Sequence, residues 1–144
     1  AQVRLARNAI HANEALGIDL VPESYGYGVT PNDPFDADLG GNGLQNFPDL
    51  DEATTDGASV SVAGTLHSYP SSSFTLEFFA SPGCDPSGHG QGQVYLGDKT
   101  VTTNAAGDAQ FTAFLTAALA EDWVVSATAT RACFATWSWN PGFL

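Results

Sequence analysis

The chain is most regular in Ser59-Val60-Ser61-Val62-Ala63-Gly64-Thr65-Leu66, where apolar residues alternate with small or polar ones. This period of two predicts a strand with one buried face and one solvent-facing face. After a turn rich in Ser and Pro, the alternation returns in Phe74-Thr75-Leu76-Glu77-Phe78, whose apolar residues share one face. Both segments therefore predict half-buried strands.

Four further segments have the composition of strands and lie between turn-forming residues. They are residues 93–96, 100–103, 109–116 and 123–130. The stretch Asn104-Ala105-Ala106-Gly107-Asp108 predicts a hairpin-like turn between two of them. Short strands with frequent turn signals predict an all-β protein, with residues 57–144 folded as an immunoglobulin-like antiparallel β-sandwich.

Residues 1–56 predict a separate and less self-sufficient region, with its boundary in the acidic stretch 49–57. Within it, Leu5, Ala9, Ala12 and Leu16 have helical spacing, which favours a short amphipathic helix over residues 5–16. The same segment also has brief apolar pieces separated by Asn and Gly, which is typical of one coil of a parallel β-helix. Helix and β-coil remain alternatives at this point.

An Asp-, Asn- and Gly-rich loop follows in residues 28–48. Such a loop can gather oxygen ligands around one point, and oxygen is the ligand that Ca²⁺ prefers. The glycines allow the chain to turn back on itself, so that amide oxygens join the carboxylates. The predicted calcium ligands are Asp33, Asp36, Asp38, Asn42 and Asn46. The alternative is an acidic solvated loop, and the spacing departs from that of an EF-hand.

The two cysteines, Cys84 and Cys133, fall at the ends of two predicted strands. A disulfide between them is the main interpretation and would contribute about 4 kcal/mol in the chain-entropy model. The alternatives are two buried free thiols, or a catalytic cysteine that would need a histidine as its base. No histidine lies in a recognisable catalytic sequence, which predicts that the chain is not an enzyme.

Composition predicts a secreted, acidic module at the cell surface. The 144 residues include no Met, two Cys and only 4 Lys plus Arg against 16 Asp plus Glu, for a formal net charge of −12. An acidic surface of this kind repels nucleic acid and anionic membranes. No apolar run approaches the roughly 20 residues that span a bilayer, so membrane insertion is not expected.

Several motifs occur in the order found in a known family. Those before residue 49 include Arg7-Asn8-Ala9-Ile10-His11-Ala12-Asn13, Gly17-Ile18-Asp19-Leu20 and Asn42-Gly43-Leu44-Gln45-Asn46-Phe47-Pro48, and those after it include Cys84-Asp85-Pro86-Ser87-Gly88 and Ala127-Thr128-Ala129-Thr130. Together they resemble the C-terminal part of secreted bacterial right-handed parallel β-helix repeat proteins, often found with a CSLREA-type segment. The resemblance implies a last β-helix coil followed by an immunoglobulin-like module. The end of the chain departs from it, with Arg131-Ala132-Cys133-Phe134 in place of an acidic Asn- and Gly-containing turn.

Apolar residues near both ends of the chain must be buried against some other segment. Val3, Leu5 and Ile10 lie in a segment too short to bury them, and Trp137 and Trp139 share one face of a predicted C-terminal strand. A strand exchanged between subunits would satisfy both ends and make a homo-oligomer or fibre. The C-terminal strand can alternatively close the sandwich of its own subunit.

These observations predict a non-enzymatic structural or adhesive module of an extracellular cell-surface protein, with calcium as its ion. The alternative is an accessory module that binds or cleaves carbohydrate, because aromatic side chains can stack on the sugars of a surface glycan. The aromatic candidates are Tyr25, Tyr27, Trp123, Trp137 and Trp139.

Overall fold

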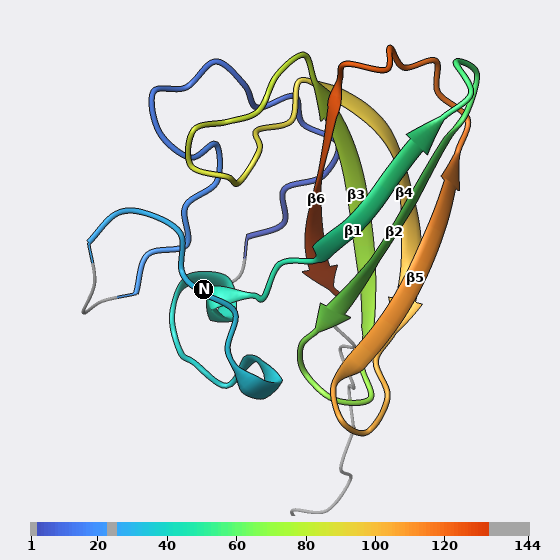
Figure 1. Ribbon diagram of the computed structural model, residues 1–144. Coiled ribbons are helices and arrows are strands. Elements are labelled where there is room, and N and C mark those ends of the chain that lie inside the picture. Colours follow the sequence, from blue (N-terminus) through green and yellow to red (C-terminus); the bar gives the residue numbers. More distant parts are fainter. Residues whose placement is uncertain (1–2, 23–25, 133–144) are drawn as a thin grey trace, which may run out of the picture.

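The computed structural model describes residues 3–22 and 26–132. Six β-strands and two short 3-10 helices lie within these residues (Figure 1). The strands are β1 (Asp49–Thr55), β2 (Val60–His67), β3 (Ser73–Ser81), β4 (Val94–Thr102), β5 (Asp108–Leu115) and β6 (Val124–Arg131). The protein is thus all-β, as the sequence predicts.

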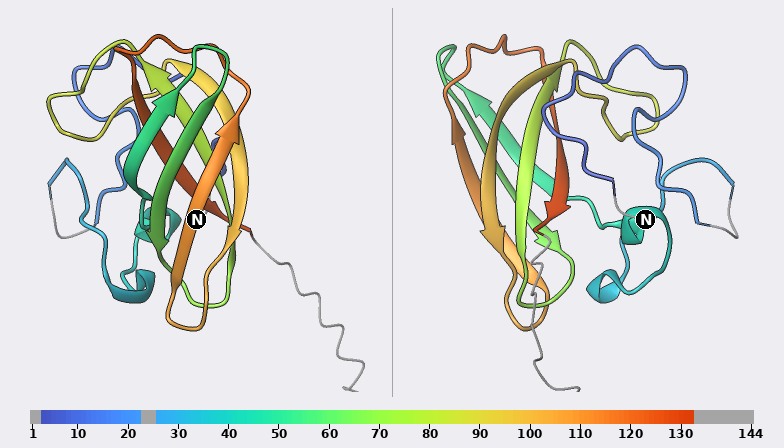
Figure 2. Two further views of the ribbon diagram at one scale, coloured as in Figure 1. Left: turned by 45° about the vertical axis from the view of Figure 1, so that its right-hand side comes forward. Right: turned by 180° about the vertical axis from the view of Figure 1, so that it is seen from behind.

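The strands form two antiparallel sheets that pack face to face as a sandwich (Figure 2). One sheet has the order β1-β2-β5 and the other has the order β4-β3-β6. In the first sheet Gly64 of β2 pairs with Phe111 of β5 and with Leu50 of β1. In the second, β3 is central, and its Phe78 pairs with Gly97 of β4 and Ala127 of β6.

The predicted strands of the sandwich are confirmed, with two differences. The segments predicted at 93–96 and 100–103 are one continuous strand, β4. The acidic stretch assigned to the region boundary contains a strand that the sequence analysis missed, β1, which pairs with β2. The predicted turn at residues 104–108 is present, since Gly107 N donates to Asn104 O at 3.0 Å, but it joins strands of different sheets.

The core lies between the sheets and comes from the alternation that the sequence displays. Along β2, the residues Val60, Val62 and Leu66 are at most 1% exposed, and the intervening residues are half-buried. Phe74, Leu76 and Phe78 of β3 are fully buried opposite them. The rings of Phe78 and Phe111 meet at 5.9 Å between centroids, which joins the two sheets at the centre.

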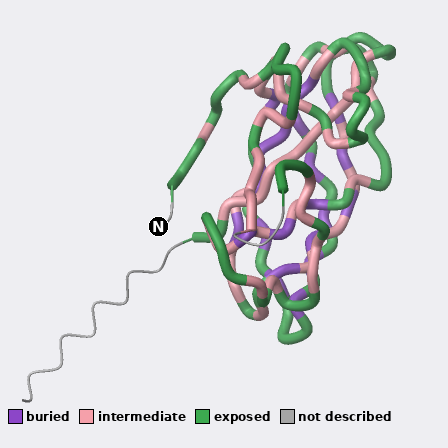
Figure 3. Tube along the Cα trace, turned by 90° about the vertical axis from the view of Figure 1, so that its left-hand side faces the viewer, coloured by how far each residue is buried: buried purple, intermediate pink, exposed green. Residues whose placement is uncertain are grey.

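Residues 3–22 and 26–48 have no regular elements apart from the 3-10 turns Pro34–Asp36 and Gly41–Leu44. Residues 3–22 contain no helix, so the helical alternative is wrong within this segment. Their one bridge is antiparallel, between Ile10 and Gly92 in the loop after β3. Figure 3 shows that the buried positions concentrate in the sandwich, while this region is mostly half-buried or exposed.

Side-chain hydrogen bonds fasten residues 3–13 to other parts of the same chain. Asn13 Nδ2 donates to Gln91 Oε1 at 2.8 Å, and Arg7 N donates to Glu77 Oε2 on β3 at 3.3 Å. The Arg7 guanidinium also lies 3.4 Å from Asp98 of β4. Among the residues that the structure describes, no helix is long and apolar enough to cross a membrane.

Candidate functional site

The Asp-rich loop is shaped by asparagine side chains that replace regular backbone pairing. Asn32 closes its base, because its Nδ2 donates to Phe47 O at 3.0 Å and its Oδ1 accepts from Phe47 N at 2.9 Å. Asn46 is 2% exposed and bonds with its side chain to Asp33 N, Asp33 O and His67 O. A buried amide with all these partners holds the loop against the end of β2.

The loop brings three carboxylates together. Asp33, Asp36 and Asp38 can each place an oxygen within 4.8 Å of the others, and all three side chains are half-buried. Asp36 Oδ1 accepts from Asn46 N at 2.8 Å, and its Oδ2 accepts from the hydroxyl of Ser68 at 2.9 Å. Asp33 accepts from Ala37 N at 3.1 Å. We name these three residues the Asp cluster.

Asp38 is the least satisfied member of the Asp cluster. Its Oδ1 is shielded from solvent and has no hydrogen-bond partner among the described residues. Burial raises the pKa of the Asp38 carboxyl, and the neighbouring carboxylates of Asp33 and Asp36 raise this pKa further. A cation among these oxygens would supply the missing partner and reverse the repulsion.

The other two predicted ligands have different partners. Asn42 clamps the backbone of Val3, since its Oδ1 accepts from Val3 N at 2.7 Å and its Nδ2 donates to Val3 O at 2.9 Å. The side-chain oxygen of Asn46 accepts a hydrogen bond from Asp33 N. The structure therefore gathers the three Asp and gives both Asn residues a role in tying segments together.

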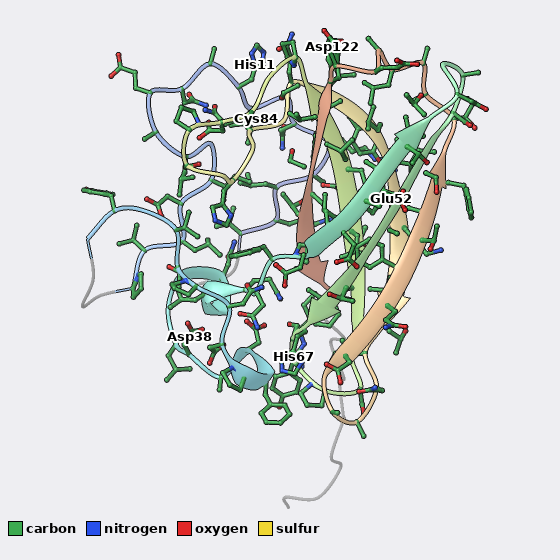
Figure 4. All side chains as sticks on the ribbon, viewed as in Figure 1. His11, Asp38, Glu52, His67, Cys84 and Asp122 are labelled. Atoms are coloured by element: carbon green, nitrogen blue, oxygen red, sulfur yellow. The ribbon has the colours of Figure 1, made fainter. Side chains whose placement is uncertain are left out.

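His67 takes part in the same junction, and the sequence analysis did not foresee this. Its Nε2 accepts a hydrogen bond from Phe35 N at 3.3 Å, so the ring proton sits on Nδ1 and is shared with Asp108 Oδ1 at 2.6 Å. The rings of Phe35 and His67 lie 5.7 Å apart. Figure 4 shows His67 and Asp38 at the same end of the molecule. The only signal in the sequence is that His67 extends the alternation of β2 by one residue.

Cys84 and the start of the C-terminal tail lie at opposite ends of one sheet. Because β3 and β6 are antiparallel, Ser81 near Cys84 pairs with Val124, whereas Phe74 pairs with Arg131. These two ends are about 23 Å apart, because seven residues of about 3.3 Å rise each separate them along the strand. The loop after β3 stays at the Val124 end, since Gln91 bonds to Asp85 at 3.1 Å and accepts from Ser126 at 3.4 Å. Figure 4 shows Cys84 far from His67.

The structure does not show the predicted disulfide, and Cys84 is a free thiol among the described residues. Cys133 lies outside the described residues, but two residues reach at most about 7 Å beyond Arg131. A disulfide needs its two Cα atoms within about 7 Å of each other. Cys84 follows the end of β3 as predicted, and the antiparallel pairing of β3 with β6 places the end of β6 at the other side of the sheet.

We expect both cysteines of the natively folded chain to be free of an intrachain bridge. Cys84 is exposed, so alkylation without reductant should label it at the rate of an open thiol. Mass spectrometry of the unfolded, non-reduced chain should then show two labels. A Cys84→Ser variant is the control and should carry one. A chain that takes up label only after reduction would contradict this expectation.

Of the five residues considered for stacking on sugars, the structure describes Tyr27 and Trp123. Tyr27 is 94% exposed, and Trp123 packs against the core of the sandwich. Tyr25, Trp137 and Trp139 lie outside the described residues. Of the other histidines, His89 packs edge-on against Phe47 with ring centroids 5.0 Å apart.

Neither the protein-family models nor the curated proteins contain a match to this chain.

Proposed function

We propose that the chain is a non-enzymatic structural or adhesive module of a secreted cell-surface protein, and that its Asp cluster holds calcium. The observation that carries the proposal is the Asp cluster itself, where Asp38 keeps a shielded oxygen without a partner. Modules of extracellular proteins use such carboxylate sites at the millimolar calcium levels outside cells. The ion would fix the Asp-rich loop in place. Asp36 of this loop bonds to Ser68, and Asn46 bonds to His67.

The proposal extends to the fold family. The strand orders β1-β2-β5 and β4-β3-β6 fit an immunoglobulin-like sandwich with a shortened set of strands. On this proposal residues 3–48 are the remnant of a closing β-helix coil, in line with the resemblance of their motifs to β-helix repeat proteins. Their dependence on the sandwich for partners supports a role as a junction between the two.

Calcium should raise the melting temperature of the chain, and a chelator should remove the rise. The sharpest variant is Asp38→Asn, because Asp36 also holds Ser68 and could not be changed without loosening the loop. In chelator, Asp38→Asn should melt no lower than the wild type, since it removes repulsion within the Asp cluster. In calcium it should lose most of the wild-type response.

The control for this experiment is Asp122→Asn, which changes the net charge equally at an exposed site outside the Asp cluster. It should keep the full calcium response. Identical wild-type melting curves in calcium and in chelator would overturn the calcium proposal.

The pH dependence of stability has a definite sign. The pKa of Asp38 is raised in the folded chain, so its contribution favours the fold at low pH and is lost as pH rises through that raised pKa. In chelator, Asp38→Asn should therefore gain stability relative to the wild type as the pH rises from 4 to 7. Thermal melts across this range measure the difference, and a difference that shrinks with pH would contradict the assignment.

One experiment distinguishes the structural role from the alternative role in binding or cleaving carbohydrate. The chain should neither sediment with insoluble cellulose, chitin or xylan nor release reducing sugar from them. Sedimentation with one of these polymers, abolished by Tyr27→Ala, would favour the carbohydrate alternative instead. Tyr69→Ala is the matched control at another exposed tyrosine.

A further inference from the structure

The sandwich is incompletely covered along β6. This strand pairs with β3 on one side, and no strand among residues 3–22 and 26–132 pairs with its other side. Its core-facing residues Val125, Ala127 and Ala129 are only half-buried, although they pack against the core. The core-facing residues of the neighbouring strand β3 are fully buried. The core therefore lacks a neighbour at the β6 edge.

A groove of about 1340 Å³ lies between the first region and the outward face of β3 and β6, and it reaches the free edge of β6; we call it the β6 groove. Every residue from 125 to 132 lines it, and the first region forms its opposite wall. It exceeds the roughly 300–1,000 Å³ of a typical small-molecule site. Val3, Leu5 and Ile18 in its walls are 63%, 43% and 41% exposed. Its volume and its exposed apolar residues suit a segment of polypeptide chain.

The chain supplies such a segment directly after β6. Ala132 N still donates to Ser73 O at 2.8 Å, so the chain follows β3 to that point without turning. The remaining sequence is Cys133-Phe134-Ala135-Thr136-Trp137-Ser138-Trp139-Asn140-Pro141-Gly142-Phe143-Leu144. In an extended strand the odd-numbered residues up to Trp139 would share one face. The core-facing residues of β6 are odd-numbered as well.

A tail that returned onto its own β6 would need a tight turn immediately after Ala132. Two-residue hairpin turns require residues that adopt positive φ, chiefly Gly, Asn or Asp. Residues 133–136 include none of these. A later turn would bring Pro141 into the returning strand, where it cannot donate to the ladder. A tail that enters the groove of another molecule needs no turn at all.

We propose that residues 133–139 of a second copy occupy the β6 groove, antiparallel to β6, and that the exchange is reciprocal. Such a contact is self-complementary and closes as a two-fold dimer. Antiparallel pairing of odd with odd positions sets Trp137 opposite Ala127 and Trp139 opposite Val125, so large side chains fill the space beside small ones. The donated strand would also cover Val3 and Leu5.

This inference does not rest on the proposed calcium role. It keeps the strand exchange predicted from the sequence but moves the exchanged strand from the first residues to the tail. Residues 3–13 are fastened to their own chain through Glu77 and Gln91, so donating them would break those bonds. The predicted interface residues of both chain ends meet at one groove in this arrangement.

The test is the molar mass of the intact chain by light scattering after size exclusion, with reductant present to remove disulfide-linked species. We expect twice the mass of one chain. The variant Trp137→Ser plus Trp139→Ser should have the mass of one chain while keeping the wild-type far-ultraviolet circular dichroism. An intact chain that stays monomeric from micromolar to millimolar concentration would overturn the proposal.

A second variant distinguishes strand exchange from non-specific association through the apolar tail. Phe134→Asn plus Ala135→Gly supplies a three-residue turn over residues 133–135, so the tail can fold back onto its own β6 with its odd-numbered residues still on the core-facing side. It should be a monomer whose tryptophan fluorescence remains as buried as in the wild-type dimer. A dimer that persists in this variant, or a polymer that grows with concentration, would contradict the reciprocal exchange. None of these measurements uses calcium, so a failure here leaves the proposed calcium role intact, and the reverse also holds.

Discussion

Replacing Asn46 by alanine is expected to release the first region from the sandwich. The change leaves Asp33 N, Asp33 O and His67 O without their partner at a buried site. Each polar group left unsatisfied costs about 1–3 kcal/mol, and the total is large against the 5–15 kcal/mol that typically stabilises a domain. Urea unfolding should show a clearly lower midpoint than the wild type. Calcium should no longer raise the melting temperature, because the Asp cluster loses its geometry.

Asn42→Gly is the matched control for this prediction, because Asn42 has a positive φ of 52°, which glycine adopts without strain. Its side chain also makes two hydrogen bonds to one backbone segment, at Val3, but these lie at the surface. Water can replace them, so the free energy of unfolding should change by no more than about 0.5 kcal/mol. Equal effects of the two substitutions would show that Asn46 is not the residue that fastens the loop.

Replacing Gly64 by alanine should push β1 away from its sheet. A Cβ at this position would meet the backbone oxygen of Asp49, the Cα of Leu50 and the ring of Phe111. In an open strand alanine is more favourable than glycine by about 0.5–1 kcal/mol. Here overpacking of about 1–3 kcal/mol, set largely by backbone atoms that cannot rotate aside, outweighs that gain. The urea midpoint should fall, and the amide hydrogens of β1 should exchange faster.

Gly83→Ala is the control, since a Cβ there meets nothing within 4 Å. It should change the free energy of unfolding by at most about 0.5 kcal/mol. A Gly64→Ala variant as stable as the wild type would mean that β1 can shift without cost.

The sandwich was predictable where one face of a strand is buried. In β2 and β3 the core-facing residues alternate with small or polar ones, and that alternation is visible in the sequence. Strand β1 was missed because only Leu50 of its seven residues packs against the core, and its acidic composition reads as a linker. Hydrogen bonds to β2, which composition does not reveal, make it a strand.

The candidate site was predictable only in its charge. Three Asp close together in a Gly-rich loop indicated the cluster that the structure forms. The roles of Asn42 and Asn46 were not predictable, because their partners Val3 and His67 are distant in sequence. The same limit applies to Cys84, whose position relative to the tail depends on the antiparallel order of β3 and β6.

The fastening of the first residues to the loop after β3 also fixes an order of events during synthesis. Arg7 bonds to a partner 70 residues later and Asn13 to one 78 residues later. These residues leave the ribosome before their partners, so they must wait for most of the sandwich to be made. Contacts over such separations form slowly, so the sandwich should close first and the leading segment should dock last. Until then its apolar residues are exposed to chaperones, to proteases and to neighbouring chains.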